Sequence, residues 1–183
     1  MFAKEIVENG LPKKWIIAGV ITVILGIFVL NAFGVVGPTE RGVMVTLGVA
    51  SEEVLSPGLK VVIPFAQKIR KYDLTPIQYK SSFNSVSDAA VTSDKQSILV
   101  NFELFWKYDD EKLYTVATRY STKESLYQPI STSLKGIIKD IVGKLSINEI
   151  IADQGGLTRQ VKEILVADTA YLPIIIDKFT ITN

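Results

Sequence analysis

Residues that commonly do chemistry are sparse in this 183-residue sequence, which contains no histidine and no cysteine. The commonest general base and metal ligand is therefore missing, and thiolate sites and disulfides are excluded. Two acidic groups remain as candidate cation sites: the run 109–111, and Glu149 with Asp153 one helical turn away. Acidic residues at such positions are more typical of helix starts and solvated helix faces. We predict no metal site, no cofactor and no catalytic residue.

A serine–lysine hydrolase is the enzyme class that this composition leaves open. Such an enzyme needs a lysine of lowered pKa beside a serine nucleophile. Ser133 and Lys135 lie two positions apart, and residues at that spacing do not face each other on a helix. A membrane-anchored Ser/Lys hydrolase is therefore only the third interpretation of the sequence.

The chain is nearly neutral and contains one long apolar run. With 20 basic and 19 acidic residues there is no basic surplus, so nucleic acid is not expected as a partner. Residues 15–33, WIIAGVITVILGIFVLNAF, form nineteen consecutive positions without a charge. As a helix this run is about 28 Å long, which matches a bilayer core of about 30 Å, and it exceeds the apolar stretch of a signal peptide. We predict a transmembrane helix over 15–33 after an N-terminal segment 1–14.

Basic residues at the two ends of this run predict its orientation. Lys4, Lys13 and Lys14 precede it, whereas Arg41 is the single basic residue within about twenty positions after it. We therefore expect a cytoplasmic N-terminus, with the rest of the chain on the opposite side of a single-pass membrane protein. A stripe of small residues every fourth position either packs against another helix or reflects the usual composition of such helices. The residues that we assign to the membrane anchor are Trp15, Ala18, Thr22, Gly26 and Phe33.

Two periodicities follow the apolar run in succession. Alternating apolar residues predict strands over 42–48, 59–63, 67–74, 77–83 and 97–108. In the last of these, one face holds Ile98, Val100, Phe102, Leu104 and Trp106. Apolar spacings of three and four then predict helices from 109, along 126–145 and over 157–165, with a capping box at 146–149 and a break at 155–156. With a final strand over 174–182, the fold class is α+β: an antiparallel β-rich first half and a helical second half.

Three strings in this order resemble the SPFH (Band 7) family, the group of stomatin, prohibitin and flotillin. They are VVGPTERGVMVTLG, LSPGLKVVIPFAQKIRKYDL and VTSDKQSILVNFELFWKYDD. The resemblance is closest to prohibitin-like members and implies an SPFH domain over 35–183, with a β-rich subdomain at 35–108 and an α/β subdomain at 109–183. The sequence departs from the family at AYLPIII, where members have Tyr-Gly-Ile. It also ends at Asn183, where a long Ala/Glu/Lys/Arg-rich helix is expected.

The resemblance implies a non-catalytic, membrane-anchored scaffold. Members assemble into large homo-oligomers, or hetero-oligomers with an SPFH paralogue, organise a membrane microdomain and modulate partner membrane proteins such as a membrane-bound AAA protease. The alternative interpretation is a small-oligomer module that binds lipid or protein. Besides the bilayer anchor, we name Lys68 and Arg70 as candidates for contact with the lipid surface, since anionic lipid attracts basic residues. The resemblance implies such contact for the loop at 63–66 as well, and there Phe65 is the candidate. A solvated sheet face is the competing interpretation of the two basic residues.

Overall fold

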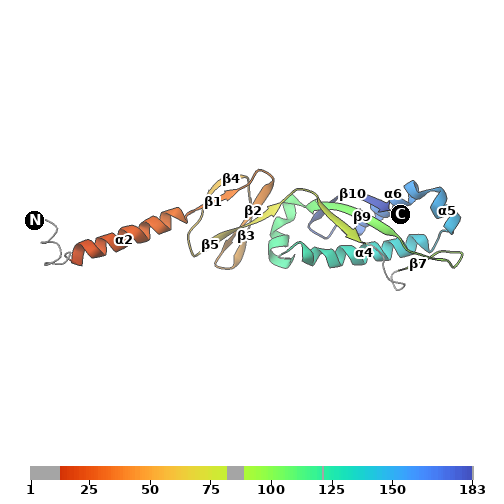
Figure 1. Cartoon of the computed structure of the whole chain (residues 1–183), viewed down its shortest axis with the longest axis horizontal. Helices are drawn as coiled ribbons and strands as arrows, with labels where there is room; N and C mark the ends of the chain where they lie inside the picture. The colour runs from red at the N-terminus through yellow and green to blue at the C-terminus, as the bar shows by residue number, and fades with distance from the viewer. Residues whose placement is uncertain (1–12, 82–88, 121, 183) are drawn as a thin grey trace, which may run out of the picture.

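The molecule is elongated, with the N-terminal helix at one end, short strands beside it and the helical half of the chain toward the other end (Figure 1). The computed structural model describes residues 13–81, 89–120 and 122–182, so most of the predicted segment 1–14 lies outside it. Helix α2 (Lys13–Leu30) extends from one end, and short strands follow it. Helices α4 (Glu124–Val142) and α6 (Gln154–Asp168) lie toward the other end, beside strands β9 (Asn101–Tyr108) and β10 (Ile174–Thr182). Antiparallel strands with separate helices confirm the α+β class.

Helix α2 differs from the predicted span at both ends. It begins two residues earlier, at Lys13, and ends three residues earlier, at Leu30. Just after its end, Asn31 donates its backbone amide and its side-chain amide to the Ile27 carbonyl oxygen, at 3.1 and 2.8 Å. Phe33 then lies in strand β1 (Phe33–Val36), so the prediction of a helix through this residue is wrong. Among residues 13–81, 89–120 and 122–182, no helix has the length and apolar character needed to cross a membrane.

Two small antiparallel sheets follow α2. Sheet A pairs β1 with β4 (Gly58–Val61), and sheet B has the order β3-β2-β5, with β2 at Glu40–Thr46, β3 at Val49–Leu55 and β5 at Gln67–Asp73. The alternation in the sequence predicts β2, β4 and β5 but misses β1 and β3. Strand β3 escapes detection because Glu52 and Glu53 interrupt its apolar pattern. Such charges are tolerated there because β3 is an edge strand.

Two glycines allow sheet A to pack closely against sheet B. A Cβ atom on Gly34 would lie 2.7 Å from Cδ1 of Ile69, and one on Gly42 would lie 2.8 Å from Cγ2 of the same side chain. Both distances are too short for carbon–carbon contact, so Ile69 fits because both positions lack a side chain. One face of sheet A is thereby fixed against sheet B, and its other face points outward.

The main core lies between the helices and sheet C, whose order is β10-β9-β6 with β6 at Ile77–Ser81. Side chains of the central strand β9 alternate between buried and half-buried. The prediction that Val100, Phe102, Leu104 and Trp106 share a buried face is confirmed. The predicted strand 97–108 is nevertheless interrupted, because Ser97–Ile98 forms β8 and pairs with β7 (Ala90–Val91) instead. Strand β10 matches the prediction over 174–182.

The predicted apolar stripe is the inner face of α4. Its buried residues are Leu126, Ile130, Leu134, Ile138, Ile141 and Val142. The chain enters α4 through three short turns of different pitch where the sequence predicts one helix. They are a 3-10 turn (Asp110–Lys112), α3 (Leu113–Thr115) and a π-helical turn (Val116–Tyr120).

Helix α5 (Ile147–Ala152) begins at the predicted capping box. The Glu149 amide donates to Ser146 Oγ at 3.4 Å, and the Ser146 amide donates to the Glu149 carboxylate at 2.8 Å. The predicted break at 155–156 is misplaced, since α6 begins at Gln154. The Asp153 carboxylate accepts the Gly156 amide at 2.8 Å, so this carboxylate caps α6.

Candidate membrane-contact site

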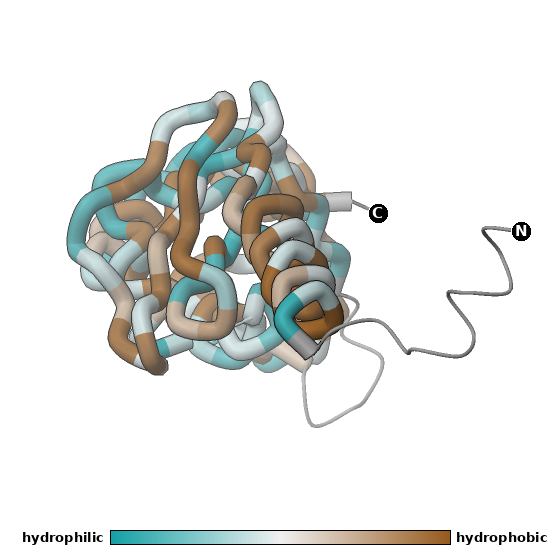
Figure 2. Tube along the Cα trace, turned by 90° about the vertical axis from the view of Figure 1, so that its left-hand side faces the viewer, coloured by the Kyte–Doolittle hydropathy of each residue, from teal (hydrophilic) through white to brown (hydrophobic). Residues whose placement is uncertain are grey.

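Helix α2 exposes apolar side chains on all sides. Every residue over 14–30 is exposed, and Lys14 and Thr22 are the polar ones among them. Thr22 donates its hydroxyl to the Ala18 carbonyl oxygen at 2.9 Å, so its polarity is satisfied inside the helix. Viewed from this end of the molecule, the helical coil is largely hydrophobic (Figure 2). The predicted anchor residues Trp15, Ala18, Thr22 and Gly26 all lie on α2, and a helix without a polar face requires apolar surroundings.

The outer face of sheet A continues this apolar surface. Its register places Phe33 opposite Val61 and Val35 opposite Leu59, and all four side chains are exposed. Residues opposite each other in antiparallel strands share a face of the sheet. The exposed apolar surface therefore extends from α2 onto the strands that follow it.

Leu47 and Phe65 present their side chains at the tips of two loops, and we call them the tip residues. Their exposed fractions are 80% and 93%. Both have the left-handed backbone conformation, with φ of 49° and 66°, which costs about 1–2 kcal/mol for a residue with a Cβ atom. Strain of this kind is typical of functional loops. The sequence pointed to Phe65 but not to Leu47, whose available signal is the following turn residue Gly48.

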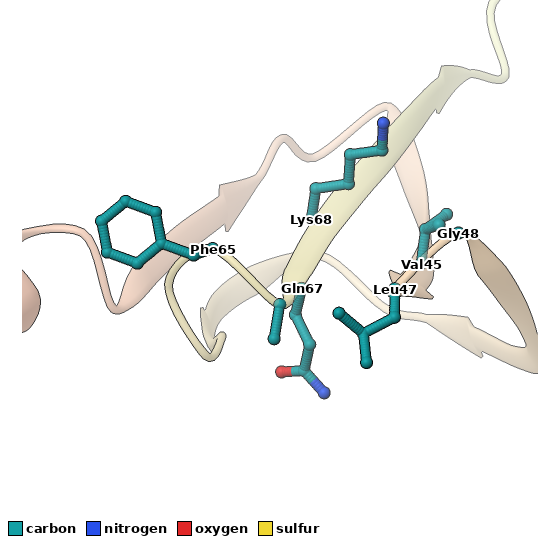
Figure 3. Close-up of a pocket in the computed structure, with 7 residues that line it drawn as sticks. Val45, Leu47, Gly48, Phe65, Gln67 and Lys68 are labelled. Carbon is teal, nitrogen blue, oxygen red and sulfur yellow. The ribbon is translucent and has the colours of Figure 1, made fainter.

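Hydrogen bonds join the two tip loops into one unit. The Leu47 amide donates to the Ala66 carbonyl oxygen at 2.8 Å. Gln67 adds two bonds, since its Nε2 donates to Thr46 Oγ1 at 3.2 Å and its Oε1 accepts the Ile63 amide at 2.9 Å. Figure 3 shows Leu47 and Phe65 on either side of the strand that carries Gln67. The two tips are therefore held at a fixed separation.

The two predicted basic contacts have different environments. Lys68 lines an open groove of about 340 Å³ together with the two tip residues. Arg70 lies farther along β5, where its Nη1 donates to the Ala117 carbonyl oxygen at 2.9 Å. The structure therefore brings Lys68 close to Phe65, whereas Arg70 binds the π-helical turn.

The strands next to α2 are firmly joined to the rest of the molecule. Arg41 of β2 pairs with Asp110 at 3.3 Å, alongside the Arg70 bond. The rings of Tyr72 in β5 and Tyr108 in β9 meet edge to face, with centroids 5.5 Å apart. Burial raises the pKa of both tyrosines, that of Tyr108 to about 12. Sheet B is therefore joined to sheet C and to the turns that precede α4.

The acidic side chains of the other candidate groups accept backbone hydrogen bonds or form ion pairs. Asp109 accepts the Glu111 amide at 3.1 Å, and the backbone bond from Ser146 lowers the pKa of the capping residue Glu149. Ser133 and Lys135 both lie on α4, at a spacing that directs their side chains to different sides. Across the described part of the chain, no group of three acidic side chains gathers to hold a metal ion.

Comparison with known proteins gives the same family that the sequence resembles. The model of the SPFH domain / Band 7 family matches residues 34–183. "Modulator of FtsH protease HflC" of Escherichia coli (strain K12) is 26% identical over 165 residues, which are 86% of this chain and 48% of that protein. An uncharacterized protein of Archaeoglobus fulgidus is 26% identical over 157 residues, 85% of this chain and 58% of that protein.

The chain spans about half the length of the curated relatives it matches. The region matched by the family model begins in β1 and continues through β10, so it includes every strand and helix described above except α2. The chain belongs to the SPFH domain / Band 7 family.

Proposed function

We propose that this chain is the membrane-held part of a non-catalytic scaffold that modulates partner membrane proteins. One observation carries the proposal: exposed apolar side chains gather at one end of the molecule, on α2, the outer face of sheet A and the tip residues. Contiguous apolar surfaces of this extent mark sites of contact with membranes or proteins. Here α2, extended by the remainder of the uncharged run 15–33, inserts into a bilayer, and sheet A and the tips lie against its surface.

Charge supports this placement. Lys13 and Lys14 stand at the start of α2, where basic residues favour the cytoplasmic side, so the folded domain lies across the membrane from the N-terminus. Lys68 lies beside the tip residue Phe65, where a cation is attracted to anionic headgroups.

The partner proposal comes from the relatives. The Escherichia coli relative is named a modulator of FtsH protease, and we extend modulation of a membrane-bound AAA protease to this chain. The scaffold forms large homo-oligomers or mixed oligomers with an SPFH paralogue, and thereby organises the membrane around the protease.

Flotation with vesicles tests the membrane proposal in the full chain. The double substitution Val20→Asp with Ile24→Asp places two charges on exposed positions of α2, so it should release the protein from floating vesicles without unfolding the domain. The matched control, Val20→Leu with Ile24→Leu, should float like the unaltered chain. A charged variant that floats as well as the unaltered chain would contradict membrane insertion of α2.

Topology and modulation have separate readouts. Because the chain lacks cysteine, Lys4→Cys and Thr132→Cys each give a unique thiol, and a membrane-impermeant maleimide should label them from opposite sides.

Turnover of a membrane substrate by a co-reconstituted AAA protease should change on adding the chain, and the charged α2 variant should not change it. Equal turnover with and without the chain would refute modulation.

A further inference from the structure

The groove between the two tip loops combines apolar walls with a single charge. It holds about 340 Å³, and its lining includes Leu47, Gly48, Phe65 and Lys68. Among the described residues that line it, Lys68 is the one with a charged side chain, and none is acidic. The groove therefore offers a cation beside two exposed apolar side chains, a composition that suits an amphipathic anion.

The strand register places this groove on the face of sheet B that points away from sheet A. Val45 lies opposite Lys68 in the ladder of β2 and β5, so their side chains share a face. The next residue, Ile69, points to the other face, where it fits against Gly34 and Gly42. Sheet A thus covers the Ile69 face of sheet B and leaves the Lys68 face to the groove.

Lys68 differs from the other cations of β5 in having no partner. Its ammonium forms no ion pair with the described residues. Lys71 lies 4.0 Å from the Glu40 carboxylate, and Arg70 donates to the π-helical turn. Figure 3 shows the Lys68 side chain extending from the strand on the side opposite to Gln67. Lys68 is therefore the cation of β5 that remains available to an anion.

Two backbone amides at the groove are also available. The amides of Gly48 and Phe65 donate to no oxygen atom among the described residues. A Cβ atom on Gly48 would meet nothing within 4 Å, so the chain leaves the backbone there open to approach. Free backbone N–H groups in turns bind anions, phosphate groups among them. The groove therefore borders on three donors that a phosphate oxygen accepts from.

We propose that this groove binds the phosphodiester headgroup of one anionic phospholipid, of which phosphatidylglycerol is the simplest example. A lipid is the occupant because the groove lies between the tips, which rest against the bilayer in the function proposed above. Leu47 and Phe65 then lie beside the acyl chains, and Lys68 meets the phosphate. Phosphatidylethanolamine also has a phosphate, but its ammonium group is repelled by Lys68. This inference rests on the proposed membrane placement and names the lipid that the tips select.

Lipid retention by the full chain tests the site. Chain extracted in a mild detergent is equilibrated with equal amounts of phosphatidylglycerol and phosphatidylethanolamine, and native mass spectrometry counts the bound lipids. The unaltered chain should prefer phosphatidylglycerol, Lys68→Gln should lower this preference about 5-fold, and Lys68→Arg should keep it. Lys71→Gln is the matched control, since it removes the same charge from the other face of the same strand and should leave the preference unchanged.

Two further arms separate this site from general charge, from free phosphate and from the membrane anchor. Equal loss of preference in Lys68→Gln and Lys71→Gln would overturn the headgroup site, because overall charge would then explain it. Excess inorganic phosphate should leave phosphatidylglycerol bound, and its displacement would overturn the lipid as the occupant. An unaltered chain that floats with vesicles but shows no lipid preference would overturn the headgroup site and leave the anchor standing. A chain that fails to float would overturn the membrane placement as well.

Discussion

Replacing both tip residues by asparagine should stabilise the fold and weaken lipid binding at the same time. Leu47 and Phe65 have φ of 49° and 66°, a conformation that asparagine tolerates better than leucine or phenylalanine. Relief of the strain, about 1–2 kcal/mol per residue, should raise the free energy of unfolding of the double variant by roughly 1 kcal/mol or more. Almost no packing is lost, because the side chains are 80% and 93% exposed.

The loss of lipid binding follows from the same exposure. Fully burying one large apolar side chain is worth about 1.5–3 kcal/mol. Half-immersion of two tips at a bilayer surface then contributes about 1.5–3 kcal/mol in total. The double variant should therefore bind vesicles about 10- to 150-fold more weakly.

The assay uses residues 32–183, which lack the strong anchor. Side chains over 14–30 are all exposed, so removing them takes nothing from the core, and the bond from the Val62 amide to the Ala32 carbonyl oxygen, 2.8 Å long, remains. Vesicle co-sedimentation gives the affinity and urea unfolding gives the stability. Ile151→Asn, at an exposed apolar site on α5 toward the far end, should leave vesicle binding unchanged. Unchanged binding of the tip variant, or a loss of stability, would refute the reasoning.

Three further predictions concern the fold. Gly42→Ala should lower the free energy of unfolding by about 1–3 kcal/mol, measured by urea denaturation, because the added Cβ would meet Ile69. The substitution Ile69→Ala should cost less stability in the Gly42→Ala variant than in the unaltered chain. Strict additivity of the two substitutions would contradict this close contact. Ser146→Ala should lower the free energy of unfolding by about 1 kcal/mol because it removes the α5 cap, whereas Ser146→Asp should keep most of the stability that the cap provides. Equal losses of stability in thermal melts of the two variants would argue against the cap. Burial raises the pKa of Tyr108 from 10.0 to about 12. The contribution of this tyrosine to the free energy of unfolding is therefore complete below pH 10 and is lost as the pH rises toward 12. Tyr108→Phe should therefore unfold at higher pH in an alkaline titration, and an unchanged midpoint would count against it.

The elements that the sequence predicts well each have one solvent-exposed face and one buried face. In β9 the side chains alternate between the core and the surface, and in α4 the apolar stripe repeats every three or four residues. Both patterns exist because a single core lies on one side of the element. The capping box at Ser146 is equally local, since its two residues bond only to each other.

Elements that escape prediction depend on distant partners or lack a polar face. Strand β1 begins at Phe33, the last residue of the uncharged run 15–33, so periodicity cannot place the boundary between helix and strand. The break between β8 and β9 depends on pairing with β7, which the alternating pattern does not reveal.

The candidate site divides in the same way. Phe65 was named through the family resemblance, whereas the exposure of Leu47 comes from a backbone conformation that no sequence pattern encodes. Arg70 shows how a basic cluster in sequence separates in space: its partner carbonyl, that of Ala117, lies 47 positions away. A charge is therefore easy to find in a sequence, but what it binds is not.

The bond between the tip loops also has a geometric consequence. A single membrane helix by itself leaves the attached domain free to tilt and to rotate about the helix axis. The Leu47 amide on the Ala66 carbonyl oxygen ties two further supports together, and β1 begins three residues after α2 ends. On a flat bilayer the domain then has three points of contact, α2 and the two tip loops, and three points determine its tilt relative to the membrane. Copies that lean alike can be laid out in a regular array, while copies on flexible stalks cannot.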